Sequence, residues 1–437
     1  MLNLITKNQN HLFLKFIFFI VFVVFSLHIY NSFFSMLGNK WAFCELFVNY
    51  AGGFMKRGIL GEVFINLNQS FGLKPFSFFS PLFTLLYILQ IIILYKLVYQ
   101  YKKSKLICAF LVFSPALLLF NIYDINTYFT KDIFTKIAIL VHALFIVSKV
   151  SSQSSLVDYN KFLNFFLIPF LFFNILNHEH QVFFISVHLL LTLTANYNYS
   201  GVKSLKSLKI YLILLLPFFL ILFTPNSFEK VGLINDSIRS FDVKINDQHA
   251  GNINLMIGGF LKWHFMNMPS YKHNIIDFLN LFICFTLSLF IFFLIFNYFL
   301  KKNILKVNFF TKKYYVLFFL PCSAMFICVL DHGRTLNIFS IHLVSFFLAL
   351  KINQNNFNKI NKNLNNNYFL KNFLYLFLFF YFFMWYIPVG AGYDSIGTFA
   401  EGDTIFKNTL FNELINLFMT FYNFVDSNIF TLPRIVN

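Results

Sequence analysis

Long apolar runs separated by short polar stretches follow one another along this chain and limit the folds that it can adopt. Several runs approach the roughly 20 residues that an α-helix needs to cross a lipid bilayer. Hydrophobic residues make up 58% of the sequence and charged residues 12%, a balance that excludes a soluble globular domain. We therefore predict an all-α fold: a polytopic integral membrane helical bundle with about 11 (10–12) transmembrane helices, folded as a single domain over residues 1–437.

The apolar runs define the expected spans. We place them at about 12–35, 77–100, 106–123, 133–150, 162–177, 181–198, 208–224, 276–300, 314–330, 335–351 and 371–389. The first run lacks the small-residue cleavage site of a signal peptide, so we expect it to be retained as a span. The stretch 405–424 is also apolar, but Lys407 and Glu413 favour an interfacial helix over a twelfth span.

Basic residues determine the predicted orientation. With the N-terminus in the cytoplasm, the inner connections hold Lys102, Lys103 and Lys105, then Lys161, Lys203 and Lys206, then Lys301, Lys302, Lys306, Lys312 and Lys313, and finally Lys351, Lys359 and Lys362. This repeats the positive-inside bias at each inner loop. Of the 17 acidic residues, which do not enter the orientation, only Asp158 falls inside. Membrane topology thus accounts for the net charge of +17, and we expect no nucleic-acid partner.

Three polar regions interrupt the single membrane domain. They are a first periplasmic segment at 36–75, a large periplasmic loop at 225–275 and an Asn/Lys-rich cytoplasmic loop at 352–367. The large loop is the one long enough to form a lid or a pocket wall. The five cysteines form no CxxC motif and predict no disulfide framework.

The densest group of glycines and charges lies at 49–62, in the first periplasmic segment. Its glycines allow a backbone to approach a ligand closely, and adjacent Lys56 and Arg57 offer donors suited to a phosphate or diphosphate. Glu62 lies beside this pair as a candidate catalytic acid. An interfacial turn whose basic side chains extend toward lipid headgroups explains the same pattern equally well.

The next outer loop carries Asp124, Lys131 and Asp132 within ten residues. A sugar-binding site requires such groups, because carboxylates accept hydrogen bonds from sugar hydroxyls. The alternative is a solvated loop whose Asp132 caps the helix that follows.

The fifth and sixth spans are short and meet at His178, Glu179 and His180, which predicts a hairpin or a broken helix near the outer face. Ionisable groups at membrane depth are costly and are usually retained for function. We expect desolvation to raise the pKa of Glu179, so that it or either histidine acts as a general acid or base. Structural polar capping is the alternative. The HEH spacing supplies no third or fourth ligand, so we predict no metal and no cofactor.

The ninth and tenth spans meet at Asp331, His332 and Arg334. A local ion pair between Asp331 and Arg334 is one interpretation. The other makes these residues part of the substrate site, with Arg334 as a second cation for a diphosphate and His332 as a proton carrier.

All these polar clusters fall on the outer side of the predicted bundle. Clusters confined to one face suit a lipid-linked substrate whose anionic head lies at the interface while its tail stays in the bilayer. Lys56, Arg57 and Arg334 would hold the diphosphate leaving group, and a carboxylate or imidazole would deprotonate the acceptor hydroxyl. This hypothesis requires the clusters to converge in space.

The many spans, the Phe-, Ile-, Leu-, Asn- and Lys-rich composition, the long outer loop and the outer cationic clusters resemble the Wzy-type polymerases of O-antigen and capsular polysaccharide. The likeness extends over the whole chain and is one of overall character. It implies a glycosyltransferase-type polymerase that joins undecaprenyl-diphosphate-linked repeat units on the periplasmic side of the bacterial inner membrane. It also implies contact with membrane lipids, a chain-length regulator as partner, and roles for periplasmic arginines and acids, here Arg57, Arg334 and Glu179.

Two other functions remain open. The bundle also resembles C-type membrane glycosyltransferases, which transfer a single sugar from a polyprenyl-phosphate donor; Glu45 or Glu62 would then be the acid of the first outer loop. The second is a flippase or transporter for a lipid-linked glycan, which would require charged residues along a cavity within the spans.

Overall fold

The computed structural model describes residues 45–102, 130–149, 156–200, 206–224, 227–240, 291–302 and 332–350, with isolated positions within 12–26, 108–120, 286, 319–322 and 372–377. Helices make up 84% of the structure, and the described residues contain no strand. The predicted all-α class is therefore confirmed.

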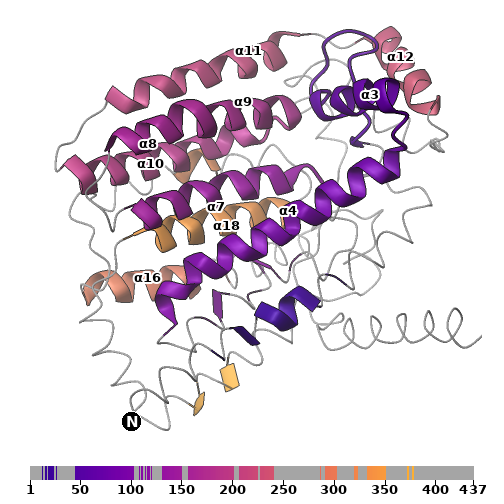
Figure 1. Cartoon of the computed structure of the whole chain (residues 1–437). Helices are drawn as coiled ribbons and strands as arrows, with labels where there is room; N and C mark the ends of the chain where they lie inside the picture. The colour runs from indigo at the N-terminus through magenta and orange to yellow at the C-terminus, as the bar shows by residue number, and fades with distance from the viewer. Residues whose placement is uncertain are drawn as a thin grey trace, which may run out of the picture.

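Helix α7 (Asp132–Lys149) lies at the centre of the described helices and packs against α4 (Pro75–Val98) and α18 (His332–Ala349), as Figure 1 shows. Most of its apolar side chains are buried, including Ile133, Ile137 and Leu140. The charged Lys131, Asp132 and Lys136 at its beginning are buried as well. The first turn of α7 therefore brings charge into the interior of the protein.

Helices α8 (Leu156–Phe162) and α9 (Ile168–Asn177) are joined without a break by the π-helical segment η3 (Leu163–Leu167). The Ile168 N–H donates to the Leu163 carbonyl, five positions back. Pro169 follows at once and has no N–H to donate, so the regular α-helical ladder cannot continue through it. One helix of 21 residues, Val157–Asn177, results from this arrangement.

The chain then turns back into α10 (Gln181–Ser200). The 3₁₀ segment η4 (Lys206–Leu214) leads into α11 (Leu215–Phe223), which packs against α9 and is the outermost helix in Figure 1. Helix α16 (Ile291–Lys301) lies near the other side, beyond α18 in the same view. Much of the outward surface of α4, η3 and α11 is apolar, with Leu85, Phe165 and Phe223 among the most exposed side chains.

Among the described residues, two helices are long and apolar enough to cross a membrane. One is Ser77–Tyr101, which contains most of α4 and the short 3₁₀ turn η1 (Tyr99–Tyr101), and the other is Val157–Asn177. Shorter apolar helices cover Gln181–Asn196, Leu208–Phe223 and Gly333–Ala349. These features are compatible with a membrane protein, but the predicted bundle of about eleven spans is not confirmed within the described residues. Most of the spans predicted at 12–35, 106–123, 276–300, 314–330 and 371–389 lies outside them.

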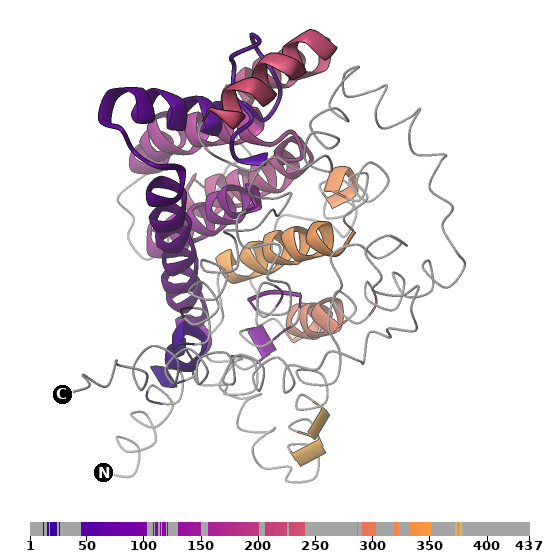
Figure 2. The ribbon, with the colours of Figure 1, turned by 90° about the vertical axis from the view of Figure 1, so that its right-hand side faces the viewer.

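Helices α3 (Ile59–Phe71) and α12 (Phe228–Arg239) lie together at one end of the bundle, as both views show (Figures 1 and 2). Helix α3 ends at Gly72, whose positive φ of 63° lets its N–H bond back to the Asn68 carbonyl. Helix α12 begins after Ser227, whose hydroxyl accepts the Lys230 N–H. The candidate functional site lies at this end of the bundle and includes Arg57, which comes just before α3.

Candidate functional site

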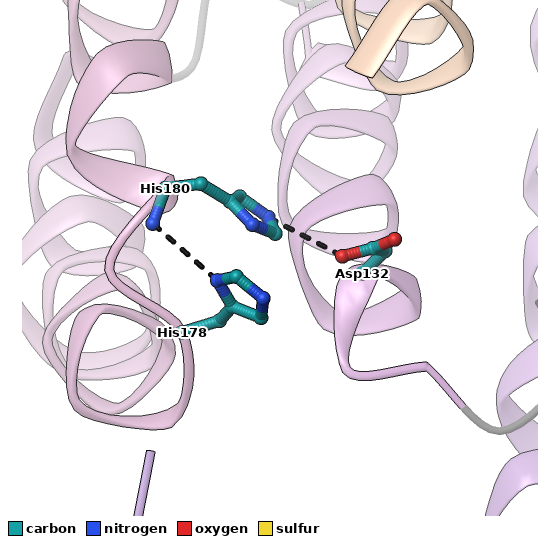
Figure 3. A group of neighbouring side chains, drawn as sticks. All are labelled: Asp132, His178 and His180. Atoms are coloured by element: carbon teal, nitrogen blue, oxygen red, sulfur yellow. Dashed lines mark hydrogen bonds and ion pairs between the residues drawn. The ribbon is translucent and has the colours of Figure 1, made fainter. Parts of the chain in front are cut away.

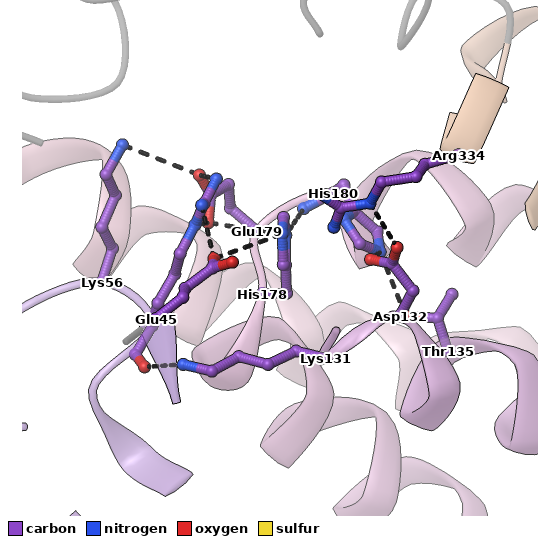
Figure 4. Close-up of polar contacts among 10 residues, drawn as sticks. Glu45, Lys56, Lys131, Asp132, Thr135, His178, Glu179, His180 and Arg334 are labelled. Atoms are coloured by element: carbon purple, nitrogen blue, oxygen red, sulfur yellow. Dashed lines mark hydrogen bonds and ion pairs between the residues drawn. The ribbon is translucent and has the colours of Figure 1, made fainter. Parts of the chain in front are cut away.

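Ten polar side chains meet where α7 and α18 begin and α9 ends (Figure 4). They are Glu45, Lys56, Arg57, Lys131, Asp132, Thr135, His178, Glu179, His180 and Arg334. Every member except Arg57 is buried, and Arg57 is 21% exposed. We call this group the ion cluster.

Arg57 holds one half of the ion cluster together. Its Nε and Nη2 donate to the two carboxylate oxygens of Glu179 at 2.8 and 2.7 Å, and its Nη1 donates to Glu45 Oε1 at 2.6 Å. Such two-pronged, charge-assisted contacts are the strongest side-chain hydrogen bonds in proteins. Arg57 also has a φ of +67°, a left-handed conformation that costs about 1–2 kcal/mol outside glycine. The hydrogen bonds of Arg57 to Glu45 and Glu179 offset this cost and hold the backbone in the left-handed conformation.

Two lysines flank this arginine. Lys131 Nζ donates to the Arg57 carbonyl at 2.5 Å, and Lys56 Nζ lies 3.6 Å from Glu179 Oε1. Burial lowers the pKa of Lys131 to about 8, although Glu45 opposes that shift. Burial also lowers the pKa of Lys56, against the attraction of Glu179. Both ammonium groups are therefore easier to deprotonate than a lysine in water.

Asp132 and Arg334 form the other half. Arg334 Nε donates to Asp132 Oδ2 at 2.8 Å, and His180 Nε2 lies 3.6 Å from Asp132 Oδ1 and 3.2 Å from the Thr135 hydroxyl. Burial by itself would raise the pKa of Asp132, but Arg334 and then His180 outweigh it, so the pKa lies below its usual value. Asp132 is thus an ionised carboxylate at the N-terminal end of α7, where the helix dipole also favours negative charge.

His178 lies between the two halves. Its Nε2 is 3.8 Å from Glu45 Oε1, its Nδ1 is 3.8 Å from Glu179 Oε2, and its ring centroid is 3.8 Å from that of His180. Burial, then His180 and Arg57, hold the pKa of His178 well below its usual value. Burial likewise lowers the pKa of His180 to about 4. At neutral pH both imidazoles are uncharged and retain a nitrogen lone pair.

The expected raised pKa of Glu179 is wrong. Burial acts in that direction, but the nearby charges of Arg57 and Lys56 are stronger and hold its pKa well below the usual value. The sequence placed Glu179 in an apolar setting without showing the arginine that pairs with it. Glu179 is consequently an ionised partner for cations.

The structure brings together most of the side chains selected from the sequence. Those in the ion cluster are Lys56, Arg57, Lys131, Asp132, His178, Glu179, His180 and Arg334. Glu62 contacts its own segment instead: its Oε2 accepts the Tyr50 N–H at 3.0 Å, and its Oε1 accepts from Asn66. Asp124, Asp331 and the side chain of His332 lie outside the described residues.

Two members of the ion cluster were not singled out for this role. Glu45 entered only as the acid of an alternative function, and nothing marked Thr135 except its position one helical turn after Asp132. Glu45 contacts Arg57, and Thr135 contacts His180, two residues that the sequence did select. A single sequence gives no signal for such pairs when they come from different segments.

A second buried polar group lies deeper among α7, α8, α10 and η4. His142 Nδ1 is 3.1 Å from His188 Nδ1, and His142 Nε2 is 2.8 Å from the Tyr159 hydroxyl. Tyr159 donates to Thr192 at 3.0 Å, and Thr192 lies 2.8 Å from the Tyr211 hydroxyl. The sequence analysis missed this group, although histidines inside apolar runs are an available signal.

Comparison of the chain with protein-family models finds no match. Comparisons with curated proteins and with solved structures find none either. The chemistry of the ion cluster must therefore be inferred from its own residues.

Proposed function

We propose that this chain is a multi-pass protein of the bacterial inner membrane, with its N-terminus in the cytoplasm and the ion cluster at the periplasmic face. Three observations support this: two apolar helices of spanning length, exposed apolar side chains on α4, η3 and α11, and a lysine bias toward the predicted inner loops. The ion cluster belongs to the end of the bundle that carries α3 and α12, which the predicted topology assigns to the outside.

We further infer that the protein is a polymerase that joins undecaprenyl-diphosphate-linked oligosaccharide repeat units in O-antigen or capsule synthesis. One observation carries this inference: Arg57 and Arg334, from distant parts of the chain, belong to one buried cluster with two neutral imidazoles. Arginine forks match the oxygens of a diphosphate, and a neutral imidazole can take a proton from an acceptor hydroxyl. The two requirements of glycosyl transfer from a diphosphate donor thus meet in one place.

The proposed reaction uses these groups in the following way. The acceptor hydroxyl oxygen bonds to the anomeric carbon of the donor sugar, and the bond from that carbon to the diphosphate oxygen breaks. The hydroxyl proton moves to His178 or His180, while Arg57, Arg334 and Lys56 stabilise the negative charge on the departing undecaprenyl diphosphate. In the unliganded protein Glu179 and Glu45 satisfy Arg57, so the diphosphate would replace a carboxylate on the same donors.

A C-type glycosyltransferase is the second candidate because of Glu45. This acid of the first outer segment lies inside the ion cluster, where it accepts a hydrogen bond from Arg57 at 2.6 Å. That is the place a first-loop catalytic acid would occupy. Such an enzyme would add one sugar from a monosaccharide-lipid instead of lengthening a chain.

A flippase or transporter for a lipid-linked glycan is the third candidate. Lys136 and His142 are buried along α7, so ionisable groups do occur between the helices. Without a bond-forming step, loss of a transporter would leave lipid-linked repeat units on the cytoplasmic leaflet.

The test compares surface glycans, by gel, from a strain that lacks the gene and carries Arg57→Ala, Arg334→Ala or His178→Gln. Arg239→Ala is the matched control, because Arg239 is exposed and pairs with the exposed Asp236. The polymerase proposal expects the wild type and control to restore the long-chain ladder. The three variants, present in the membrane at control levels, should leave a single repeat unit on the lipid anchor.

Other outcomes identify the alternatives. A ladder of normal length with every band shifted indicates a single-sugar transferase. Repeat units retained on the cytoplasmic leaflet indicate a transporter, and an unchanged profile in the deletion strain rejects all three functions.

A further inference from the structure

We propose that Asp132, His178 and His180 form a binding site for a divalent first-row transition-metal ion such as zinc or manganese. Each residue offers one ligand atom, and these atoms lie within 4.8 Å of one another. All three side chains are buried. Figure 3 shows the two imidazoles extending from the turn between α9 and α10 toward Asp132 at the beginning of α7.

The spacing of the ligand atoms suits a shared metal better than a hydrogen bond. His180 Nε2 and Asp132 Oδ1 are 3.6 Å apart, which is beyond hydrogen-bond length. In a tetrahedral site with metal bonds of about 2.0–2.1 Å, neighbouring ligand atoms lie roughly 3.3 Å apart. Small side-chain movements would therefore bring these atoms onto one ion.

The two oxygens of Asp132 are used differently. Oδ2 accepts from Arg334, whereas Oδ1 is buried and has no hydrogen-bond partner among the described residues. A buried carboxylate oxygen without a partner is costly, and a bound ion is one way to satisfy it. The unsatisfied oxygen is the one that lies toward His180.

Neighbouring residues provide the outer contacts that metal sites require. Arg334 fixes the Asp132 carboxylate through its other oxygen. His178 has a carboxylate near each ring nitrogen, Glu45 beside Nε2 and Glu179 beside Nδ1. Its Nδ1 also accepts the His180 backbone N–H at 3.5 Å, so Nε2 is the nitrogen left to bind the ion or to donate to Glu45 after a small movement.

The donor set defines the class of ion. Two imidazole nitrogens and one carboxylate oxygen favour zinc, manganese or iron over magnesium and calcium, which prefer oxygen ligands throughout. Three protein ligands leave coordination positions for water or for a substrate oxygen. The HEH sequence did not indicate this site, because the third ligand comes from α7.

The charges of the ion cluster bear on which other group would bind together with the metal ion. Within the ion cluster, three carboxylates (Glu45, Asp132 and Glu179) already face the four basic side chains Lys56, Arg57, Lys131 and Arg334. A dication adds to this positive charge, so an anion must bind with it. The metal site stands without the glycan substrate, but its role beside a diphosphate rests on the proposed function. With the metal bound, both imidazoles would be ligands, and the proton of the acceptor hydroxyl would pass to another group of the ion cluster.

Metal binding is tested on the purified full-length chain in detergent, treated with chelator and then equilibrated with Zn²⁺ or Mn²⁺. We expect one retained ion per chain in the wild type and at least about tenfold weaker binding in Asp132→Asn, His178→Gln and His180→Gln. Asp236→Asn removes an exposed carboxylate and His342→Gln a buried imidazole outside the ion cluster, so both should bind as the wild type does. Thr135→Val should also bind, since it removes only the alternative partner of His180.

A gain of signal keeps the test decisive if the loss variants fold poorly. With Co²⁺ as the probe, Asp132→Cys should show a near-ultraviolet thiolate-to-cobalt charge-transfer band that the wild type lacks. A wild type that retains no ion, binding unaffected by the three ligand substitutions, or an Asp132→Cys protein without this band would overturn the proposal. Metal binding by a protein that makes no glycan ladder would reject the proposed function and leave the metal site intact.

Discussion

Arg57 donates two hydrogen bonds to Glu179, 122 positions further along the chain, and these bonds join the segment before α3 to the turn between α9 and α10. Loss of either residue removes the main partner of the other, leaving Arg57 with Glu45 alone or Glu179 with Lys56 alone. Structural and functional roles of this pair are therefore combined.

Arg57→Ala should lower the free energy of unfolding by about 3 kcal/mol, because it leaves Glu179 buried without its main partner. The double variant Arg57→Ala with Glu179→Gln should lose less than the sum of the two single losses. Thermal unfolding of the purified chain, followed by far-ultraviolet circular dichroism, measures both. Arg239→Ala breaks only an exposed pair and should stay within about 0.5 kcal/mol of the wild type; additive single losses would contradict the coupling.

Gly61→Ala should destabilise the protein through a backbone clash. A methyl group at Gly61 would lie 2.2 Å from the Val48 carbonyl oxygen and 2.8 Å from the Phe47 carbonyl carbon. Nothing lies within 4 Å of the same position on Gly232, which is in the middle of α12. We expect a fall of more than about 1 kcal/mol for Gly61→Ala and a gain of up to about 1 kcal/mol for Gly232→Ala. Equal unfolding midpoints for the two variants would contradict this prediction and would show that the backbone at 45–62 moves to accommodate the added methyl group.

Tyr159→Phe should cost about 1–3 kcal/mol, since it removes the hydroxyl between His142 and Thr192 while keeping the ring. Tyr298→Phe is the matched control because Tyr298 is 42% exposed. The unfolding midpoints of both variants at neutral pH provide the comparison. An unfolding midpoint equal to that of Tyr298→Phe would contradict this prediction. It would mean that water or another group forms a hydrogen bond with His142 in place of the Tyr159 hydroxyl.

Stability should fall between about pH 10 and pH 12 because of Tyr50. Burial, and then Glu62, raise the pKa of Tyr50 to about 12, whereas a tyrosine in the unfolded chain titrates near 10. In that interval the unfolded state has lost its proton and the folded state keeps it, so raising the pH favours unfolding. Tyr50→Phe should make the fall of the unfolding midpoint with pH shallower than in the wild type, and Tyr298→Phe gives the control slope.

Helix positions were largely predictable from the sequence because they follow local hydrophobicity. The run expected at 77–100 corresponds to α4 at Pro75–Val98, and the run expected at 133–150 to α7 at Asp132–Lys149. The run expected at 162–177 was too short, because α8 begins at Leu156 with polar residues and continues through a π segment that no periodicity indicates. Among the described helices, two have the length and apolar composition needed to cross a membrane. Whether a helix does cross one also depends on its surroundings, which local hydrophobicity does not specify.

The ion cluster was predictable as a set of candidates but not as a set of pairs. A dense group of glycines and charges marked Arg57, membrane depth marked Glu179, and a polar junction between two predicted spans marked Arg334. The partner of each is set by how distant segments pack, so the pairing of Arg334 with Asp132 could not be derived from its own loop. The predicted direction of the Glu179 pKa shift was wrong for the same reason, because the shift depends on Arg57, which is distant in sequence.

The Asp132–Arg334 contact also sets an order for biogenesis. These residues are 202 positions apart, so α7 is synthesised and must be accommodated long before α18 can supply the guanidinium. During that interval the nascent chain carries an acid that its final neighbours have not yet neutralised. The ion cluster therefore cannot be completed until α18 has been synthesised, because Arg334 comes from its first turn.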